Sequence, residues 1–250
     1  MKLTVLGSGT SVPNLQRNSA GYLLEENGQR FLIDFGYGNI HQLLRLGITY
    51  HDIDRIFFTH PHPDHMCDLI PFLFASKYPL DPRTRDLPII AGPGFAEYFE
   101  RMMKAFNHWL APDSYTVQII ELDEETREFD GLEVTAGKVQ HIEMSRGFRF
   151  TNAEGKMVTF SGDTDYCDEI VELGRRADLL ILECSTPDDM KVEKHLTPEL
   201  CGRIAREAGC KTLLLSHFYP PCEMSSVLAS CQREFSGKII LADDLTTVDL

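Results

Sequence analysis

The stretch "FFTHPHPDHMCD", residues 57–68, places three histidines and two aspartates directly after a pair of phenylalanines. The apolar residues before it predict a short buried strand. If that strand ends near position 60, His60 and His62 leave it two residues apart and can face the same way, while Asp64 and His65 open the next helix. We therefore expect four ligand-type side chains on one loop.

A single histidine is usually a surface residue or a hydrogen-bonded core residue. The four fixed positions of HxHxDH match by chance in only roughly one chain in a thousand. We therefore interpret this motif as a metal-binding loop.

Length and composition place limits on the rest of the molecule. The chain has 250 residues with 43% hydrophobic and 25% charged side chains, which suits one large layered α/β domain over residues 1–250. Its formal net charge of −14 disfavours extended nucleic-acid binding. We find neither a signal peptide nor an apolar run of roughly 20 residues, so we expect a cytoplasmic protein without a membrane segment. The seven scattered cysteines indicate neither a disulfide framework nor a thiolate zinc site.

The order of predicted elements suits two β-sheets faced by helices. A first strand ends at a glycine turn, and residues 21–36 predict a hairpin that turns at Asn27-Gly28. Residues 65–78 predict one helix that Pro71 should kink or shorten, and residues 95–110 predict another. Strands then fill residues 115–160, with turns at Asp130-Gly131 and Glu154-Gly155, after which helices and strands alternate.

Further ligand-type residues follow other apolar runs. His141, Asp163 and His217 each come after a predicted strand, where the edge of a sheet would present them to a shared cleft. Each alone is unremarkable, but together with the first motif they provide enough ligands for two metal ions.

The motifs "THPHPDH", "SGDT" and "LLLSHF", in that order, resemble the metallo-β-lactamase superfamily. "GSGTSVPNLQRNSAGYLL", "ILECST" and "HLTPELCGRIAREAG" are similar to its branch of ribonuclease Z and related phosphodiesterases. The resemblance spans residues 2 to about 248. It implies a four-layer αββα sandwich, with two mixed β-sheets flanked by helices and the metal site at one edge of the sheets.

The resemblance also implies how the ligands divide between two divalent metal ions. His60, His62 and His141 would hold one ion, Asp64, His65 and His217 the other, and Asp163 would bridge both. Imidazole and carboxylate ligands suit Zn²⁺, and also Mn²⁺ or Fe. The choice among these metals stays open.

Three residues have expected catalytic roles. A water between two dications loses its proton near neutral pH, and Asp64 is placed to orient the resulting hydroxide. By resemblance, His195 would stabilise the developing charge or protonate the leaving oxygen, and Glu183 would keep that imidazole charged. The alternative for His195 is a helix start, with Thr197 as N-cap and Pro198 in the first turn.

Several other features carry weaker signals. "GSGTS", residues 7–11, meets neither nucleotide-binding glycine motif, so we expect a tight turn and no cofactor site there. Core packing or a dimer face explains Trp109 and its apolar neighbours better than a substrate lid does. Arg83 and Arg85 could meet a substrate phosphate, but surface charge is the simpler interpretation.

The chain departs from ribonuclease Z in two places. Only 21 residues separate His141 from Asp163, where those enzymes usually carry a long basic arm that grips transfer RNA. "HFYPPC" stands where a serine and an arginine typically follow the last metal histidine. We therefore expect a hydrolase of small phosphodiesters or nucleotides.

Three alternatives stay open. They are a tRNA 3′-processing endoribonuclease like ribonuclease Z, a metal-dependent lactonase, thioesterase or sulfatase, and a non-enzymatic metal-binding scaffold. The expected partner is a small ester, and the resemblance also implies a homodimer.

Overall fold

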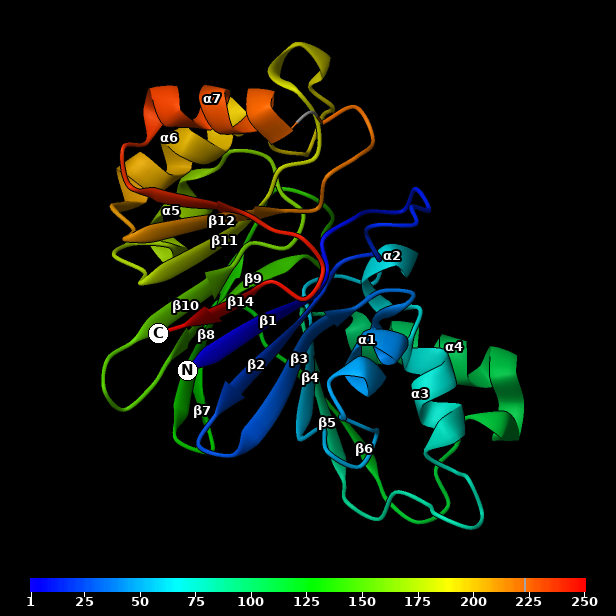
Figure 1. Cartoon of the computed structure of the whole chain (residues 1–250). Helices are drawn as coiled ribbons and strands as arrows, with labels where there is room; N and C mark the ends of the chain where they lie inside the picture. Colours follow the sequence, from blue (N-terminus) through cyan, green and yellow to red (C-terminus); the bar gives the residue numbers. More distant parts are fainter. Residues whose placement is uncertain (223) are drawn as a thin grey trace.

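Two seven-stranded β-sheets pack face to face, and helices cover both outer faces, in a computed structural model that describes residues 1–222 and 224–250 (Figure 1). The four-layer αββα architecture of two mixed sheets predicted from the sequence is confirmed.

The first sheet has the strand order β14-β1-β2-β3-β4-β5-β6. Strands β14, β1, β2 and β3 pair antiparallel, whereas β3, β4, β5 and β6 run parallel. Its strands are β1 (Lys2–Gly7), β2 (Gly21–Glu26), β3 (Gln29–Phe35), β4 (Arg55–Phe58), β5 (Leu87–Ala91), β6 (Val117–Glu121) and β14 (Thr247–Asp249).

The second sheet has the order β13-β12-β11-β10-β9-β8-β7. Strands β10 to β13 run parallel, and β7 to β10 pair antiparallel. Its strands are β7 (Thr126–Phe129), β8 (Leu132–Lys138), β9 (Arg146–Thr151), β10 (Met157–Phe160), β11 (Leu179–Glu183), β12 (Thr212–Ser216) and β13 (Lys238–Leu241).

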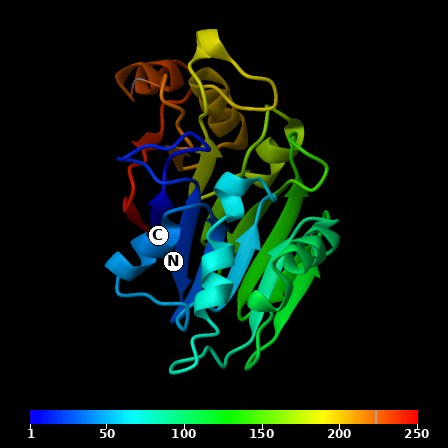
Figure 2. The same ribbon diagram turned by 90° about the vertical axis from the view of Figure 1, so that its right-hand side faces the viewer.

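Helices from the first part of the chain cover the first sheet, and those from the last part cover the second (Figures 1 and 2). The first group is α1 (Asn39–Arg45), α2 (Pro63–Met66), α3 (Leu69–Ala75) and α4 (Phe95–Phe106), followed by a 3₁₀ turn, η1 (Asn107–Trp109). The second group is α5 (Asp168–Leu173), α6 (Pro198–Ala208) and α7 (Met224–Glu234), with the 3₁₀ turn η2 (Asp188–Met190). Within the described residues, no helix is both long and apolar enough to cross a membrane.

Three apolar layers fill the spaces between these four structural layers. The central one joins the sheets, and Phe57 stands in its middle with its ring against those of Phe129, Phe148 and Phe150. A second cluster packs the first sheet on α1 to α4, and a third packs the second sheet on α5 to α7. Alternation of side chains along each strand supplies both faces.

Two predicted helices differ from the observed ones. The helix expected over residues 65–78 is two short helices, α2 and α3, and Pro71 lies in the first turn of α3. Proline fits there because the first-turn amides have no partner within the helix. The helix expected over residues 95–110 ends at Phe106 and continues as a 3₁₀ turn.

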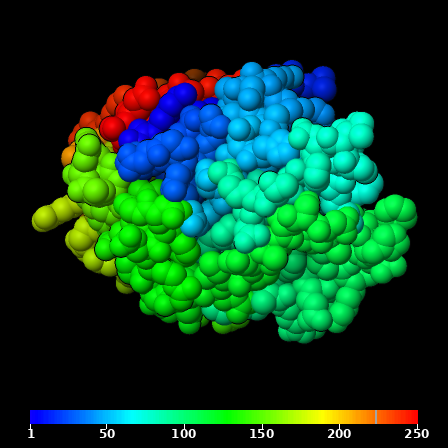
Figure 3. Space-filling view, turned by 90° about the horizontal axis from the view of Figure 1, so that it is seen from below, coloured from blue at the N-terminus to red at the C-terminus, as the bar shows by residue number. Residues whose placement is uncertain are grey.

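The two sheets approach each other at one end, where the residues with metal-ligand chemistry lie. The backbone N–H of Arg146, at the start of β9, donates to the carbonyl of Thr59, just after β4, at 2.9 Å. Strands β4, β8, β10 and β12 all point their carboxyl ends to this edge. The surface at the opposite end, seen from below, is formed mostly by the N-terminal half of the chain (Figure 3).

Candidate metal centre

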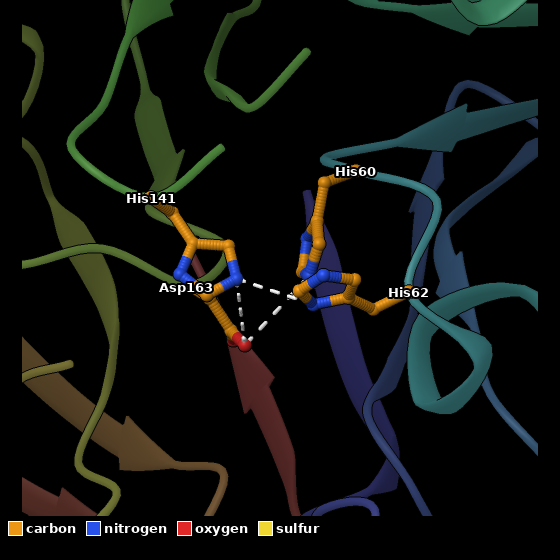
Figure 4. Close-up of side chains that lie close together, drawn as sticks. All are labelled: His60, His62, His141 and Asp163. Atoms are coloured by element: carbon orange, nitrogen blue, oxygen red, sulfur yellow. Dashed lines mark hydrogen bonds and ion pairs between the residues drawn. The ribbon is translucent and has the colours of Figure 1, made fainter. Parts of the chain in front are cut away.

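Seven histidine and aspartate side chains converge where the two sheets meet. They form two groups, and within each group the ligand atoms lie within 4.8 Å of one another. The first group is His60, His62, His141 and Asp163, and the second is Asp64, His65 and His217. Figure 4 shows the first group, in which His60 and His62 approach His141 and Asp163 from the opposite side.

Each residue reaches the cluster from the end of a strand. His60 and His62 lie in the loop after β4, and Asp64 and His65 lie in α2, which that loop opens. His141 and Asp163 follow β8 and β10, and an isolated bridge between Gln140 and Asp165 holds their two loops together. His217 directly follows β12 with a left-handed φ of 61°. The two sheets thus contribute opposite halves of the cluster.

The hydrogen bonds of His65 and His217 show that a positive charge belongs between them. The Nδ1–H of His65 donates to the Asp34 carboxylate at 2.8 Å, and the Nδ1–H of His217 donates to the Ser185 hydroxyl at 3.1 Å. The two Nε2 atoms, 3.3 Å apart, therefore present lone pairs to each other. A proton on one of the rings or a bound cation between them relieves this repulsion.

In the first group, too, ring nitrogens and a carboxylate oxygen that can bind a cation face the cluster. The Nδ1–H of His60 donates to the Thr59 hydroxyl at 3.1 Å, because that hydroxyl already donates to Asp34. The Nε2 of His60 and the Oδ1 of Asp163 are buried without a hydrogen-bond partner. The Nδ1–H of His141 donates to the carbonyl of Lys194, which leaves its Nε2 facing the Nδ1 of His62 at 3.2 Å. The unpaired atoms of His60 and Asp163 fit a divalent cation.

The electrostatics of the cluster agree with this chemistry. Burial lowers the pKa of His60 well below its usual value and lowers the pKa of His141 to about 4, so both rings are neutral and able to bind a metal. Burial also opposes charge on His65 and His217, yet the Asp163 carboxylate raises the pKa of both. The cluster therefore attracts positive charge.

Asp34, which sequence analysis did not single out, supports the cluster from behind. It lies at the end of β3 with a left-handed φ of 57°, and its carboxylate is buried. It accepts hydrogen bonds from the amide and the hydroxyl of Thr59, each at 2.8 Å, and from His65. A carboxylate at the end of the apolar run "RFLIDF" was the available signal.

A second hydrogen-bonded group joins the other side of the cluster. The Nδ1–H of His195 donates to Glu183 at 2.9 Å and lies 3.9 Å from Asp163. Ser185, also not singled out from the sequence, donates from its hydroxyl to Glu183 and accepts from His217. Burial lowers the pKa of His195, but the hydrogen bond and charge of Glu183 outweigh it and raise that pKa to about 9. Burial raises the pKa of Glu183.

The structure also answers the expectation that His195 belongs to a helix start. Thr197 occupies the N-cap position of α6 and Pro198 follows at its first residue, but the Thr197 side chain makes no capping hydrogen bond. His195 lies two residues before the cap, beside Asp163 and Glu183. The helix start and the placement of His195 in the cluster therefore coexist.

The surface-charge interpretation of the two arginines holds for Arg85 but not for Arg83. Arg83 is fully buried and donates to main-chain carbonyls, including that of Ile53 at 2.8 Å, so surface charge is the wrong interpretation. Arg85 pairs with Asp54 at 2.7 Å. Asp54 precedes β4 whereas His60 follows it, so both arginines lie at the end of the strand away from the cluster.

Trp109 is not a core residue. Its side chain is 58% exposed and contacts the exposed ring of Phe74, with 6.4 Å between the ring centroids. Met102 and Met103 do pack against the core layer under α4. Core packing therefore explains the methionines but not the tryptophan.

Comparison with known proteins places the chain in context. A family model described as the beta-lactamase superfamily domain matches residues 16–218. Ribonuclease Z of Mycobacterium bovis is 28% identical over 278 residues, covering 100% of this chain and 98% of that protein.

Solved structures share the fold over the whole length. The metallo-beta-lactamase fold protein YhfI of Bacillus subtilis has a TM-score of 0.88 at 25% identity, covering 99% of this chain and 98% of that one. A diphosphatase of the PhnP family has a TM-score of 0.76 at 23% identity, covering 100% and 97%.

Proposed function

The chain belongs to the beta-lactamase superfamily. On that premise we propose that it is a binuclear metal-dependent phosphodiesterase acting on small phosphodiesters or nucleotides. The family, the fold and the His/Asp cluster support metal-dependent hydrolysis. The proposal adds the substrate class and the role of each residue.

We assign the seven clustered side chains to two divalent cations. The Nε2 atoms of His65 and His217, which face each other, would hold one ion together with Asp64. His60, His62 and His141 would hold the other, and Asp163, which lies 3.3 Å from His65 and 3.7 Å from His60, would bind both. Zn²⁺ suits this donor set best, and Mn²⁺ and Fe are compatible with it.

The remaining chemistry belongs to side chains of the protein. When bound, two divalent cations supply Lewis acidity and an activated water for attack on the ester. Asp64, which lies 3.4 Å from His217, would orient that water or accept its proton. His195 would donate a proton to the leaving oxygen from its Nε2, because Glu183 occupies its Nδ1.

One observation carries the proposal: the His195–Glu183 pair lies next to the metal cluster. The pair makes a 2.9 Å hydrogen bond, and its imidazole is 3.9 Å from Asp163. An acid held at this place suits an alkoxide leaving group, which needs a proton as its bond to phosphorus breaks. The similarity of the fold to a diphosphatase supports chemistry at phosphorus.

A second candidate function is tRNA 3′-processing, which the 28% identity to ribonuclease Z favours. Two features oppose it. The 21 residues between His141 and Asp163 contain only a turn and the β9–β10 hairpin, and the net charge is −14. Binding RNA requires lysines and arginines that neutralise phosphates, so a strongly acidic protein without an arm favours small substrates.

The first prediction concerns His195. Protein of measured metal content should hydrolyse bis-p-nitrophenyl phosphate and a 2′,3′-cyclic nucleotide. For the cyclic nucleotide, whose alkoxide leaving group needs a proton, His195→Ala should lower kcat by about 10²-fold because general acid catalysis contributes roughly 10²–10⁴. His108→Ala, at an exposed histidine in η1, is the matched control and should leave the rate unchanged.

The outcomes separate the candidates. A loss of less than about tenfold in His195→Ala would rule out the acid role. Cleavage of precursor tRNA without turnover of the small diester would favour the ribonuclease. Bound metal without hydrolysis of either substrate would favour a scaffold.

A further inference from the structure

Tyr219 lies at the open side of the metal centre, next to both His195 and His217. Its ring centroid is 6.4 Å from that of His195 and 5.8 Å from that of His217, with interplanar angles of 75° and 79°. Its backbone N–H donates to the carbonyl of Ser185 at 3.1 Å. The phenol ring is therefore fixed beside the group that we propose protonates the leaving oxygen.

A loop from the other sheet holds the hydroxyl end of this ring. The Tyr219 hydroxyl pairs with the hydroxyl of Ser11 at 3.2 Å. Tyr37 donates to the carbonyl of Ser11 at 2.7 Å, and the N–H of Phe218 donates to the carbonyl of Ser8 at 3.0 Å. The glycine turn after β1 and the segment after β12 thus form one wall beside the site.

The outer part of this wall is apolar. Val12 and Leu15 follow Ser11 in the same loop, and their side chains are 41% and 99% exposed. They add exposed apolar surface to the loop that holds the Tyr219 hydroxyl.

Two cationic side chains in this region pair with acidic residues. Arg17 pairs with Asp243 at 2.8 Å, and Lys191 pairs with Asp165 at 2.7 Å. Arg17 and Lys191 are therefore already engaged, and the group next to His195 would meet the Tyr219 ring. This favours an uncharged leaving group with a planar face.

On the basis of the proposed function, we propose that Tyr219, held by Ser11, forms the leaving-group subsite and selects esters whose leaving group carries a planar aromatic ring. A leaving oxygen within hydrogen-bond reach of His195 lies about 3 Å from the imidazole. The atoms bonded to that oxygen then reach contact distance of the Tyr219 ring, whose centroid is 6.4 Å from that of His195. The ring would belong to an aryl group or to a nucleobase.

Calorimetry on the metal-loaded protein can measure this preference as the ratio of the dissociation constants within each of two pairs of ligands. Benzylphosphonate and ethylphosphonate carry a methylene in place of the leaving oxygen and differ by the ring. Thymidine 5′-monophosphate and deoxyribose 5-phosphate differ by the base. We expect the ring-bearing ligand of at least one pair to bind about three- to tenfold more tightly, the range expected for one aromatic contact. The pair that shows the preference distinguishes an aryl group from a nucleobase.

Variants of Tyr219 then test the residue itself. Tyr219→Phe should keep the ratio of the two dissociation constants, whereas Tyr219→Leu and Tyr219→Ala should reduce it below about twofold. Tyr78→Ala, at an exposed tyrosine between α3 and β5, is the matched control and should keep the ratio. Metal content and far-ultraviolet circular dichroism show whether each variant is folded.

Two results would overturn the inference: equal binding within both pairs by the wild-type protein, or a ratio that survives in both Tyr219→Leu and Tyr219→Ala. Turnover of bis-p-nitrophenyl phosphate by the same preparation is a separate readout. A ring preference without turnover would leave the binding subsite standing and refute the phosphodiesterase. Turnover without a ring preference would refute the binding subsite and leave the phosphodiesterase standing.

Discussion

At the scale of single residues, the groups behind the histidines decide which ring nitrogens face the cluster. Asp34 accepts from His65 and Ser185 accepts from His217, and both bonds use Nδ1. The Nε2 atoms of both rings are thereby directed inward. Such outer partners fix the tautomer and orientation of a ligand histidine and commonly change metal affinity 10- to 100-fold when removed. Ser185 has a further effect, because it also binds the Glu183 carboxylate that holds His195.

Asp34→Asn should weaken metal binding by about 10- to 100-fold. An amide has one acceptor oxygen, so it cannot accept all the hydrogen bonds that Thr59 and His65 now donate. Asparagine tolerates the left-handed φ of 57° at this position, so the change tests the hydrogen bonds and not the backbone. Chelator-competition titration measures the affinity.

The same variant should also lose about 1–3 kcal/mol of stability in denaturant unfolding, because a buried donor is left unpaired. Asp54→Asn is the control, since Asp54 also accepts a backbone N–H, from Arg30 at 2.8 Å, but at the far end of β4. Equal metal affinities in the two variants would show that Asp34 does not position His65.

At the scale of elements, local patterns in the sequence predicted most strands and both tight hairpins. Asn27-Gly28 and Asp130-Gly131 adopt positive φ, as such pairs do in two-residue turns. The strand β14 was not predicted, because "TVD" is too short to show alternation and forms only by pairing with β1. The break between α2 and α3 also depends on tertiary contacts, since the N–H of Asp68 donates to the carbonyl of Phe35.

The candidate site shows the same division between local and tertiary information. The loop at positions 60–65 carries its pattern within six residues, so sequence alone indicates it. Tyr219 and Ser185 take part only because loops from distant strands meet at one edge, and no spacing in the sequence marks such a meeting. Arg83 was misread for a related reason: two of its carbonyl partners, those of Tyr50 and Ile53, come from the distant segment before β4.

Gly162→Ala should damage the site, whereas Gly155→Ala should not. Both glycines have positive φ, at 60° and 77°, so each substitution carries a backbone cost of about 1–2 kcal/mol. A Cβ on Gly155 would meet nothing within 4 Å, but a Cβ on Gly162 would lie 2.5 Å from the Cβ of buried Thr59. Relief of that overlap must move Thr59 or the adjacent Asp163.

We therefore expect Gly162→Ala to lose a further 1–3 kcal/mol or so, typical of overpacking, and to bind less metal than the wild type. Denaturant unfolding and metal analysis of both variants measure the two effects. Equal losses of stability and full metal content in both would mean that the contact with Thr59 does not position Asp163.

At the scale of the whole molecule, the seven-residue His/Asp cluster lies between the two sheets and takes ligand-type side chains from both. His60, His62, Asp64 and His65 come from the first sheet and its helix, and His141, Asp163 and His217 come from the second. Away from this edge the sheets are held by apolar packing around Phe57. Cations at the cluster would therefore add cross-links to layers that are also joined by side-chain packing, backbone hydrogen bonds and polar pairs such as Asn152 with Glu26 and Arg55 with Asp130.

Removal of metal should lower the thermal stability of the whole fold. A ligand at about 1,000 times its dissociation constant stabilises the folded state by about 4 kcal/mol. For a chain of this size each kcal/mol shifts Tm by about 2–4 °C, so chelation should lower Tm by about 8–16 °C. Thermal unfolding before and after treatment with a chelator, with metal content measured in parallel, tests this. Asp163→Asn removes the residue shared by both groups, so it should start at a lower Tm and respond little to the chelator. Re-addition of Zn²⁺, Mn²⁺ or Fe²⁺ in turn should restore the wild-type Tm for the metals that the site accepts. An unchanged Tm after complete metal removal would mean that the two sheets do not depend on the cluster for their association.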